Sequence, residues 1–197
     1  MLKVGITGGI GSGKTIICRI FSLLGIPVFN ADIQAKVLMD TEPEVKNILT
    51  KRFGSNIYDK GILNRPLLAS VIFGNENELA FVNNLIHPLV RESFKEWCTQ
   101  YKNRDYVLHE AAILFESGLY KDLDRIILVD APEDTRIQRV IKRDGSNPES
   151  VKARIRRQMP AEQKKGMSDY ILNNDGNKLI IPEILRIDNL LKAIRQY

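Results

Sequence analysis

The sequence contains little cysteine. Cys18 and Cys98 are the two thiols among 197 residues, and they lie far apart in the chain. Neither belongs to a paired spacing such as Cys-x-x-Cys, so the sequence excludes a zinc ribbon and a disulfide-stabilised scaffold. Both cysteines fall within apolar helical patterns. We therefore expect buried thiols in a reducing compartment, the cytoplasm.

Long hydrophobic runs are also missing. No stretch approaches the roughly 18 apolar residues that a membrane-spanning helix needs, which predicts that the chain has no membrane partner. The first residues, Leu2–Thr7, predict a strand that runs into a glycine loop, rather than a signal peptide. A length of 197 residues, with 44% hydrophobic and 27% charged residues, fits a single globular domain over 1–197.

The positive charge is concentrated in one segment. The whole chain has a net charge of +5, yet residues 136–165 contain ten Lys or Arg and three acids, a local charge of +7. This segment has no Phe, Tyr or Trp to stack on bases, which argues against nucleic acid. A solvated helix face is one interpretation. A basic lid over about 139–165, whose arginines bind phosphoryl oxygens, is the other and the one we favour.

Apolar runs alternate with helical patterns, which predicts an α/β fold around a parallel sheet. We expect strands at Leu2–Thr7, Pro27–Ala31, Asp105–Glu110, Arg125–Val129 and Tyr170–Leu172. The stretch from about 40 to 102 is almost entirely helical in pattern, which indicates a helical subdomain for substrate binding. Within it, Asn64 should cap a helix to about Phe73, and Pro88 should begin a helix to about Tyr101.

A phosphate-binding loop follows the first strand. Gly8–Thr15, with the sequence GGIGSGKT, matches GxxxxGK[ST] at every fixed position and has the required strand before and helix after. A turn that merely joins strand to helix does not require Lys-Thr. The loop predicts bound ATP, with Lys14 on the β- and γ-phosphates and the Thr15 hydroxyl on Mg²⁺. The expected ATP contacts are Gly9, Gly11, Ser12, Gly13, Lys14, Thr15 and Ile16.

Two carboxylates follow predicted strands. Glu110 ends the third strand, where a P-loop enzyme often holds its Mg²⁺-orienting acid; a charged strand end with another task is the alternative. Asp32 follows the second strand, where it can accept the proton of an attacking hydroxyl. Its alternative role is to cap the next helix. The Asp-x-x-Gly and Asn-Lys-x-Asp strings of GTPases do not occur, which favours a kinase.

An ordered set of motifs resembles the dephospho-coenzyme A kinase family over nearly the full length. The set comprises VGITGGIGSGK at 4–14, Ile86-His87-Pro88, ILFESG at 113–118, Gln138-Arg139 with Lys142-Arg143-Asp144-Gly145, Ala153-Arg154-Ile155 with Gln158-Met159, and Ser168-Asp169-Tyr170 leading to Asn174 and Gly176.

The resemblance implies a three-layer P-loop NTPase fold with five parallel strands in the order 2-3-1-4-5, a helical substrate subdomain and a basic lid. It implies ATP-dependent phosphorylation of the ribose 3′-hydroxyl of dephospho-coenzyme A, with ATP and Mg²⁺ as cofactors and no nucleic-acid partner. The implied catalytic residues are Asp32, Lys14, Arg139 and Arg143. Arg154 and Asn174 would contact ATP, and Thr15 and Glu110 the metal. Arg65, His87 and Glu116 would contact the substrate; for His87, a local cap or a core contact is the alternative.

The chain departs from that pattern at two places. The usual Asp-Ala-Asp is Asn30-Ala31-Asp32, which keeps the expected base and changes the first acid. The usual Asp-x-Pro is Glu110-Ala111-Ala112, which lengthens the predicted metal-shell side chain by one methylene. Two other functions compete with this one: a P-loop kinase for another small molecule, and a regulatory or nucleic-acid-linked NTPase.

Overall fold

The computed structural model describes residues 1–194 and has two compact units. One unit combines Met1–Asn30 with the chain from Trp97 onward, and the other is Ala31–Glu96. The first unit carries the parallel sheet and the phosphate-binding loop. The second is mainly helical.

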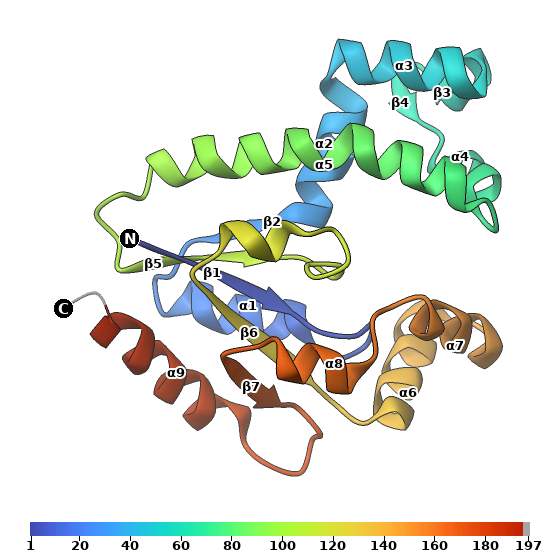
Figure 1. The fold of residues 1–197 in the computed structure, drawn as a ribbon. Helices are drawn as coiled ribbons and strands as arrows, with labels where there is room; N and C mark the ends of the chain where they lie inside the picture. Colours follow the sequence, from blue (N-terminus) through green and yellow to red (C-terminus); the bar gives the residue numbers. More distant parts are fainter. Residues whose placement is uncertain (195–197) are drawn as a thin grey trace. The chain divides into compact units, whose positions relative to one another are not determined.

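The sheet of the first unit contains β1 (Leu2–Thr7), β2 (Val28–Asn30), β5 (Tyr106–Glu110), β6 (Arg125–Asp130) and β7 (Tyr170–Asn173). All neighbouring strands are parallel and the order is β2-β5-β1-β6-β7 (Figure 1), which confirms the α/β class. The strand labels differ from 2-3-1-4-5 because the sequence did not predict two short strands, β3 and β4. Counted among the five sheet strands alone, the order is second, third, first, fourth, fifth.

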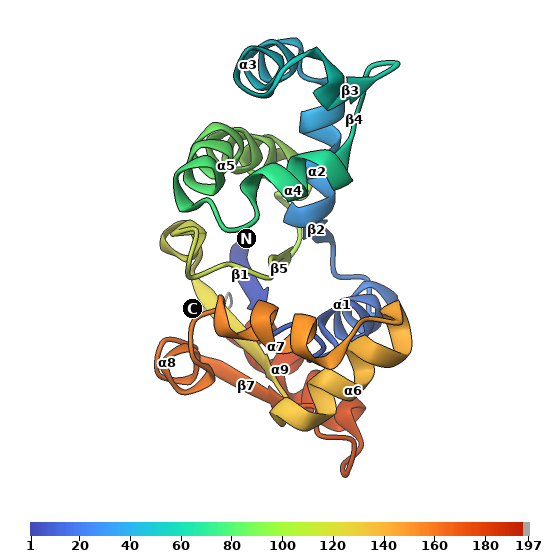
Figure 2. The same cartoon turned by 90° about the vertical axis from the view of Figure 1, so that its right-hand side faces the viewer.

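One face of the sheet is covered by α1 (Lys14–Leu23) and α9 (Ile180–Ile194), which lie side by side in Figures 1 and 2. Their apolar residues form the main core together with the strands. Helices bury the strands, and the strand sequences are almost continuously hydrophobic for that reason. Within this core the Tyr106 hydroxyl donates to Asp188 at 2.8 Å, and Lys192 pairs with Asp188 at 2.7 Å. These polar contacts join α9 to the central strands.

Residues that alternate with this core point to the other face, as strand geometry requires. His109 stacks on Phe29 at 5.4 Å between ring centroids, and Trp97 packs on Phe29 at 5.5 Å. Burial lowers the pKa of His109 to about 4, so the imidazole is neutral at physiological pH. Glu110, one residue later, points to the side of α1. The strand end therefore presents a carboxylate towards the helix that carries the phosphate-binding loop.

The basic segment folds into α6 (Glu133–Asp144), α7 (Pro148–Arg156) and α8 (Ala161–Gly166), which Figure 2 shows. Gly145 ends α6 in the left-handed conformation, with φ of 63°. The side chain of Asn147 caps α7 by accepting from the Glu149 N–H, and Pro148 occupies the first turn. A small apolar cluster that includes Val140 and Val151 packs α6 against α7.

The second unit contains α2 (Ala31–Thr41), α3 (Pro43–Phe53), the 3₁₀ turn η1 (Ser55–Ile57), β3 (Tyr58–Asp59), β4 (Ile62–Leu63), α4 (Arg65–Ile72) and most of α5 (Glu76–Thr99). The expected cap at Asn64 is confirmed, since its side chain accepts from the Leu67 N–H at 3.1 Å.

One expectation for this unit was wrong, and one element was not predicted. Pro88 lies inside α5 rather than at a helix start. A proline costs a helix one hydrogen bond, and the long apolar face of α5 offsets that loss. The β3–β4 hairpin was not predicted, because its strands have two residues each. Its turn uses positive φ at both Lys60 (47°) and Gly61 (81°).

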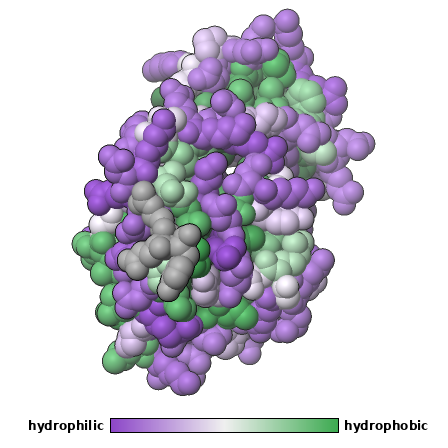
Figure 3. Space-filling view, turned by 60° about the vertical axis from the view of Figure 1, so that its left-hand side comes forward, coloured by the Kyte–Doolittle hydropathy of each residue, from purple (hydrophilic) through white to green (hydrophobic). Residues whose placement is uncertain are grey.

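No helix within residues 1–194 is long and apolar enough to cross a membrane. Hydrophilic residues cover most of the face shown in Figure 3, with smaller hydrophobic patches between them.

Candidate active site

Lys14, which was predicted to bind phosphates, contacts the backbone of the phosphate-binding loop in this structure. The Lys14 ammonium donates to the carbonyl oxygens of Gly8 at 2.7 Å and Gly9 at 3.4 Å. The N–H groups of Gly11, Gly13 and Thr15 have no acceptor within residues 1–194. Open N–H groups at a helix start form a binding site for an anion. In contrast, the N–H groups of Ser12 and Ile16 bond inside the loop, to the Gly9 and Gly13 oxygens.

Two glycines of the loop are required by its shape. Gly13 precedes α1 with φ of 96°, and a side-chain carbon there would overlap the amide nitrogen of Asn174. Gly11 has φ of 80°, and a side chain would overlap the backbone oxygen of Arg136. The loop therefore lies closely against α6 and the segment after β7.

Three side chains from outside the loop hold its backbone. The Asn174 amide donates to the Ser12 oxygen at 2.7 Å, and Arg139 donates to the same oxygen at 3.5 Å. The side-chain oxygen of Gln158 accepts from the Ile10 N–H at 2.9 Å. Sequence reasoning assigned no role to Gln158, although it belongs to a motif that we had noted; nothing local to it indicates a partner 148 residues away.

A pocket of about 560 Å³ opens beside the loop. It brings together many of the predicted ATP contacts with two of the predicted lid arginines; its lining is Gly11, Gly13, Lys14, Thr15, Ile16, Arg139, Val140 and Arg143. The Ile16 side chain is 67% exposed, which gives this basic pocket an apolar surface. Such a surface can take the flat face of a nucleotide.

Two predicted arginines are paired with one acid at the end of α6. Arg143 contacts Asp144 at 2.6 Å and Arg154 approaches the same carboxylate at 4.0 Å. The Arg143 side chain is exposed and also lines the loop pocket, whereas Arg154 does not.

Glu110 is almost fully buried, with 7% of its surface exposed. Its carboxylate accepts a hydrogen bond from the Asn30 amide at 2.7 Å. The Cys18 thiol, on α1, also donates to Glu110, and burial together with this carboxylate raises the pKa of Cys18 well above its usual range. Cys18 is therefore an unreactive thiol, and both cysteines are buried as predicted.

Glu116 contacts the base of the basic segment. Its carboxylate accepts from the Met159 N–H at 2.9 Å and pairs with the buried Lys164 at 2.9 Å. Burial favours a raised pKa for Glu116, but the bonds from Lys164 and Met159 outweigh it and lower the pKa. The predicted substrate contact is thus occupied by partners within the chain.

The second unit holds the remaining predicted residues. Asp32 is exposed in the first turn of α2, and its side chain has no hydrogen-bond partner within residues 1–194. Because α2 begins at Ala31, Asp32 is not at the capping position. His87 lies in α5, where burial and the charge of Arg91 lower its pKa.

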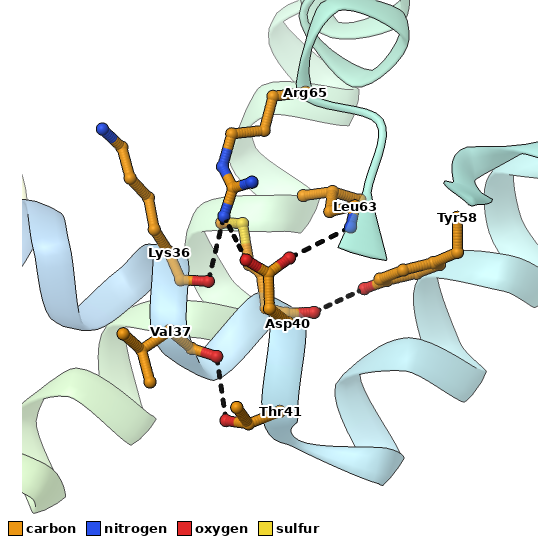
Figure 4. A network of polar contacts seen from close by, with 8 residues as sticks. Lys36, Val37, Asp40, Thr41, Tyr58, Leu63 and Arg65 are labelled. Carbon is orange, nitrogen blue, oxygen red and sulfur yellow. Dashed lines mark hydrogen bonds and ion pairs between the residues drawn. The ribbon is translucent and has the colours of Figure 1, made fainter. Parts of the chain in front are cut away.

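Arg65 is fixed by a polar network around Asp40, shown in Figure 4. Its guanidinium donates to the Asp40 carboxylate at 2.5 Å and to the Lys36 oxygen at 3.2 Å, while the Leu63 N–H donates to Asp40 at 3.0 Å. The Lys36 ammonium extends away from the network. A pocket of about 440 Å³ next to it is lined by Asp32, Ala35, Lys36, Met39, Leu63, Arg65, Leu68, Ala69 and Ile72.

Comparison with known proteins identifies the family. The family profile for dephospho-CoA kinase matches residues 2–179. The chain belongs to the dephospho-CoA kinase family. It is 40% identical over 196 residues to the dephospho-CoA kinase of Porphyromonas gingivalis, covering 99% of this chain and 96% of that one. It is 37% identical over 186 residues to that of Bacteroides fragilis, with 94% and 91% covered. Dephospho-CoA kinases are transferases, so this chain is identified as an enzyme of that class.

Solved structures share the fold of this chain. The protein TT1252 from Thermus thermophilus superposes with a TM-score of 0.82 at 31% identity, covering 98% of this chain and 96% of that one. Dephospho-CoA kinase from Campylobacter jejuni gives 0.72 at 24% identity, with 97% of each chain covered. Shikimate kinase from Bacteroides thetaiotaomicron, at 0.54 and 15% identity over 97% and 98%, shares the fold alone. The dephospho-CoA kinase fold is therefore the P-loop kinase fold expected from the sequence.

Proposed function

We propose that this dephospho-CoA kinase homologue transfers the γ-phosphoryl group of ATP to the ribose 3′-hydroxyl of dephospho-CoA, giving ADP and coenzyme A. The phosphate-binding loop is the observation that carries the proposal. Its open N–H groups at Gly11, Gly13 and Thr15 and the ammonium of Lys14 suit a triphosphate chain. Family membership supports the choice of acceptor.

Catalysis would depend on charge stabilisation by the loop pocket. Lys14 would leave the Gly8 and Gly9 oxygens and neutralise the transferred phosphoryl oxygens. Arg139 and Arg143, which line the same pocket, would add bidentate donors as negative charge builds on those oxygens. Asn174 and Arg154 would not contact the transferred phosphoryl group. Asn174 holds the loop through its hydrogen bond to the Ser12 oxygen, and Arg154 lies near the end of the lid helix α7.

A magnesium ion suits the donors that this site offers. No three His, Cys, Asp or Glu side chains of residues 1–194 gather into a self-sufficient metal site. Mg²⁺ in phosphoryl-transfer enzymes takes few protein ligands and completes its shell with phosphates and water. The exposed Thr15 hydroxyl and the carboxylate of Glu110 would hold it here. When bound by these residues, Mg²⁺ would supply positive charge that offsets the charge of the phosphate oxygens.

The helical unit would bind the acceptor. Its pocket combines the cations Lys36 and Arg65 with apolar side chains such as Met39 and Leu68, and dephospho-CoA combines a pyrophosphate with an arm that contains methyl and methylene groups. Asp32 lines the same pocket with an unpaired carboxylate, which suits a general base for the attacking hydroxyl. His87 would be a further acceptor contact.

A coupled ADP-release assay tests the proposal. ADP release should require dephospho-CoA, and mass spectrometry should place the new phosphate on the ribose 3′-oxygen. Shikimate and nucleoside monophosphates serve as alternative acceptors, and RNA and DNA as alternative activators. ADP release that is equal without any acceptor, or that only another acceptor stimulates, would show that the proposed reaction is wrong.

A further inference from the structure

Asn30 and Glu110 are direct neighbours across two strands. The parallel register of β2 and β5 places Asn30 opposite Glu110. Cross-strand partners point to the same face of the sheet. The Asn30 side-chain nitrogen lies 2.7 Å from Oε2 of Glu110, which is the length of a charge-assisted hydrogen bond. The contact joins the last residues of two adjacent strands, at the edge of the sheet where ligands of α/β proteins bind.

A second neutral donor reaches the same carboxylate from another direction. Cys18 lies on α1, one helical turn after Lys14, and its thiol donates to Glu110. Glu110 is 7% exposed and Cys18 is 5% exposed, so little water competes for these bonds. Neutral donors orient a carboxylate without cancelling its charge. Asn30 and Cys18 therefore fix the direction of the Glu110 carboxylate at the strand end.

We propose that Asn30 is a positioning residue that fixes the carboxylate of Glu110 for the metal–nucleotide complex. This inference rests on the proposed function of Glu110 as a metal-shell residue. A glutamate has three rotatable side-chain bonds, and holding it in one rotamer costs conformational entropy. The bond from Asn30 offsets that cost before the metal arrives, as partners of metal-binding carboxylates commonly do.

The donor must be an amide rather than a second acid. An aspartate at position 30 has almost the same shape as Asn30 but cannot donate when ionised. It would place a second carboxylate within hydrogen-bond distance of buried Glu110, and two ionised carboxylates at that distance repel each other. In this chain, Asn30 and Glu110 form a matched pair of donor and acceptor.

Binding of a non-hydrolysable ATP analogue at varied Mg²⁺ concentration tests the pair without turnover. We would compare Asn30→Ala, Asn30→Asp, Glu110→Gln and the double variant Asn30→Ala/Glu110→Gln. Asn30→Ala should raise the half-saturating Mg²⁺ concentration by about 10-fold or more, the usual effect of losing a partner of a metal ligand. Asn30→Asp should do the same or worse. Analogue affinity without metal should stay within about twofold of the parent.

The double variant separates positioning from an independent effect. If Asn30 acts through Glu110, the double variant should need no more Mg²⁺ than Glu110→Gln alone. Asn47→Ala, on an exposed helix of the second unit, is the matched control and should behave like the parent. The electron paramagnetic resonance spectrum of Mn²⁺ bound in place of Mg²⁺ reports directly on the ligands of the metal. This spectrum should change in Asn30→Ala.

Each failure has its own pattern. If Glu110→Gln keeps the parent Mg²⁺ dependence, the proposed metal role of Glu110 is wrong and the inference falls with it. If Glu110→Gln is impaired but Asn30→Ala or Asn30→Asp matches the parent, Glu110 binds metal and the positioning role is wrong. Fully additive losses in the double variant would also overturn the positioning role.

Discussion

The side-chain oxygen of Gln158 accepts a hydrogen bond from the Ile10 N–H at 2.9 Å, which ties the end of the basic segment to the phosphate-binding loop. The next residue, Met159, donates its N–H to Glu116 at 2.9 Å. The linker between α7 and α8 is thus bonded to the loop on one side and to the segment after β5 on the other. The loop is therefore held partly by the basic segment that was predicted to form its lid.

Gln158→Ala should loosen the loop. A hydrogen bond of this kind contributes about 0.5 to 1.5 kcal/mol, so ATP affinity should fall about 2- to 10-fold. The Ile10 amide should exchange its hydrogen faster, because it loses its acceptor. Gln163→Ala, on the exposed surface of α8, is the control. Unchanged exchange at Ile10 in Gln158→Ala would show that the bond does not hold the loop in solution.

Glu116 should make the stability of the chain depend on pH. Its pKa in the folded state is lowered, so the stability it contributes is present above its unfolded pKa and is lost as pH falls through the folded pKa. Glu116→Gln leaves buried Lys164 without a counter-charge, which should cost about 2 to 3 kcal/mol at pH 7, given that Glu116 is partly exposed.

Urea unfolding at pH 7 and at pH 3.5 measures this effect. The gap between parent and Glu116→Gln should shrink at the lower pH, because there the unfolded chain takes up a proton at Glu116 more readily than the folded protein does. Glu162→Gln breaks an exposed pair with Lys165 and should cost under about 1 kcal/mol at either pH. A gap that is equal at both pH values would mean that the Glu116 charge does not stabilise the fold.

Arg139→Ala and Arg143→Ala should lower kcat by about 100-fold or more, with smaller losses of ATP affinity. Both side chains line the loop pocket, and donors that meet developing charge act mainly in the transition state. Arg143 must leave Asp144 to do so. Lys142→Ala, on the same helix and outside the pocket, is the matched control. Equal losses in kcat and in ATP affinity would make the arginines plain binding charges.

Lys14→Ala should reduce turnover by about 10³-fold while the melting temperature stays near that of the parent. The Lys14 ammonium contacts oxygens of the loop, and the main core contains no part of it. Removing one charge-stabilising donor typically costs about 10² to 10³ in rate, and Lys14 carries a full charge. Near-parental turnover by a folded Lys14→Ala protein would contradict the assignment of the loop.

The features that the sequence predicted have short-range causes. The strands were found because each is a short apolar run next to a helix, and the loop because GGIGSGKT has few structural alternatives. The Asn64 cap was found from its own neighbours. The fold order came from the family resemblance, since no local pattern shows which strands are adjacent.

The features that were missed depend on partners distant in sequence. The contacts between Ile10 and Gln158, between Lys164 and Glu116 and between Asn30 and Glu110 each join residues that only the tertiary fold brings together. Propensity also failed at Pro88, where burial of the α5 face outweighs the lost backbone bond.

Asp32 offers the sharpest test of the chemistry. Asp32→Asn keeps the size of the side chain and removes the base. Because α2 begins at Ala31 and Asp32 lies inside its first turn, the variant loses only a favourable interaction with the helix dipole, about 0.3 to 1 kcal/mol. General-base catalysis contributes about 10² to 10⁴-fold. The variant should therefore melt close to the parent, bind ATP normally and turn over at least about 100-fold more slowly.

Asp59→Asn, on the β3–β4 hairpin, controls for loss of one exposed acid in the same unit. Turnover of Asp32→Asn within about threefold of the parent would remove Asp32 as the base, and Glu110 would be the next carboxylate to test.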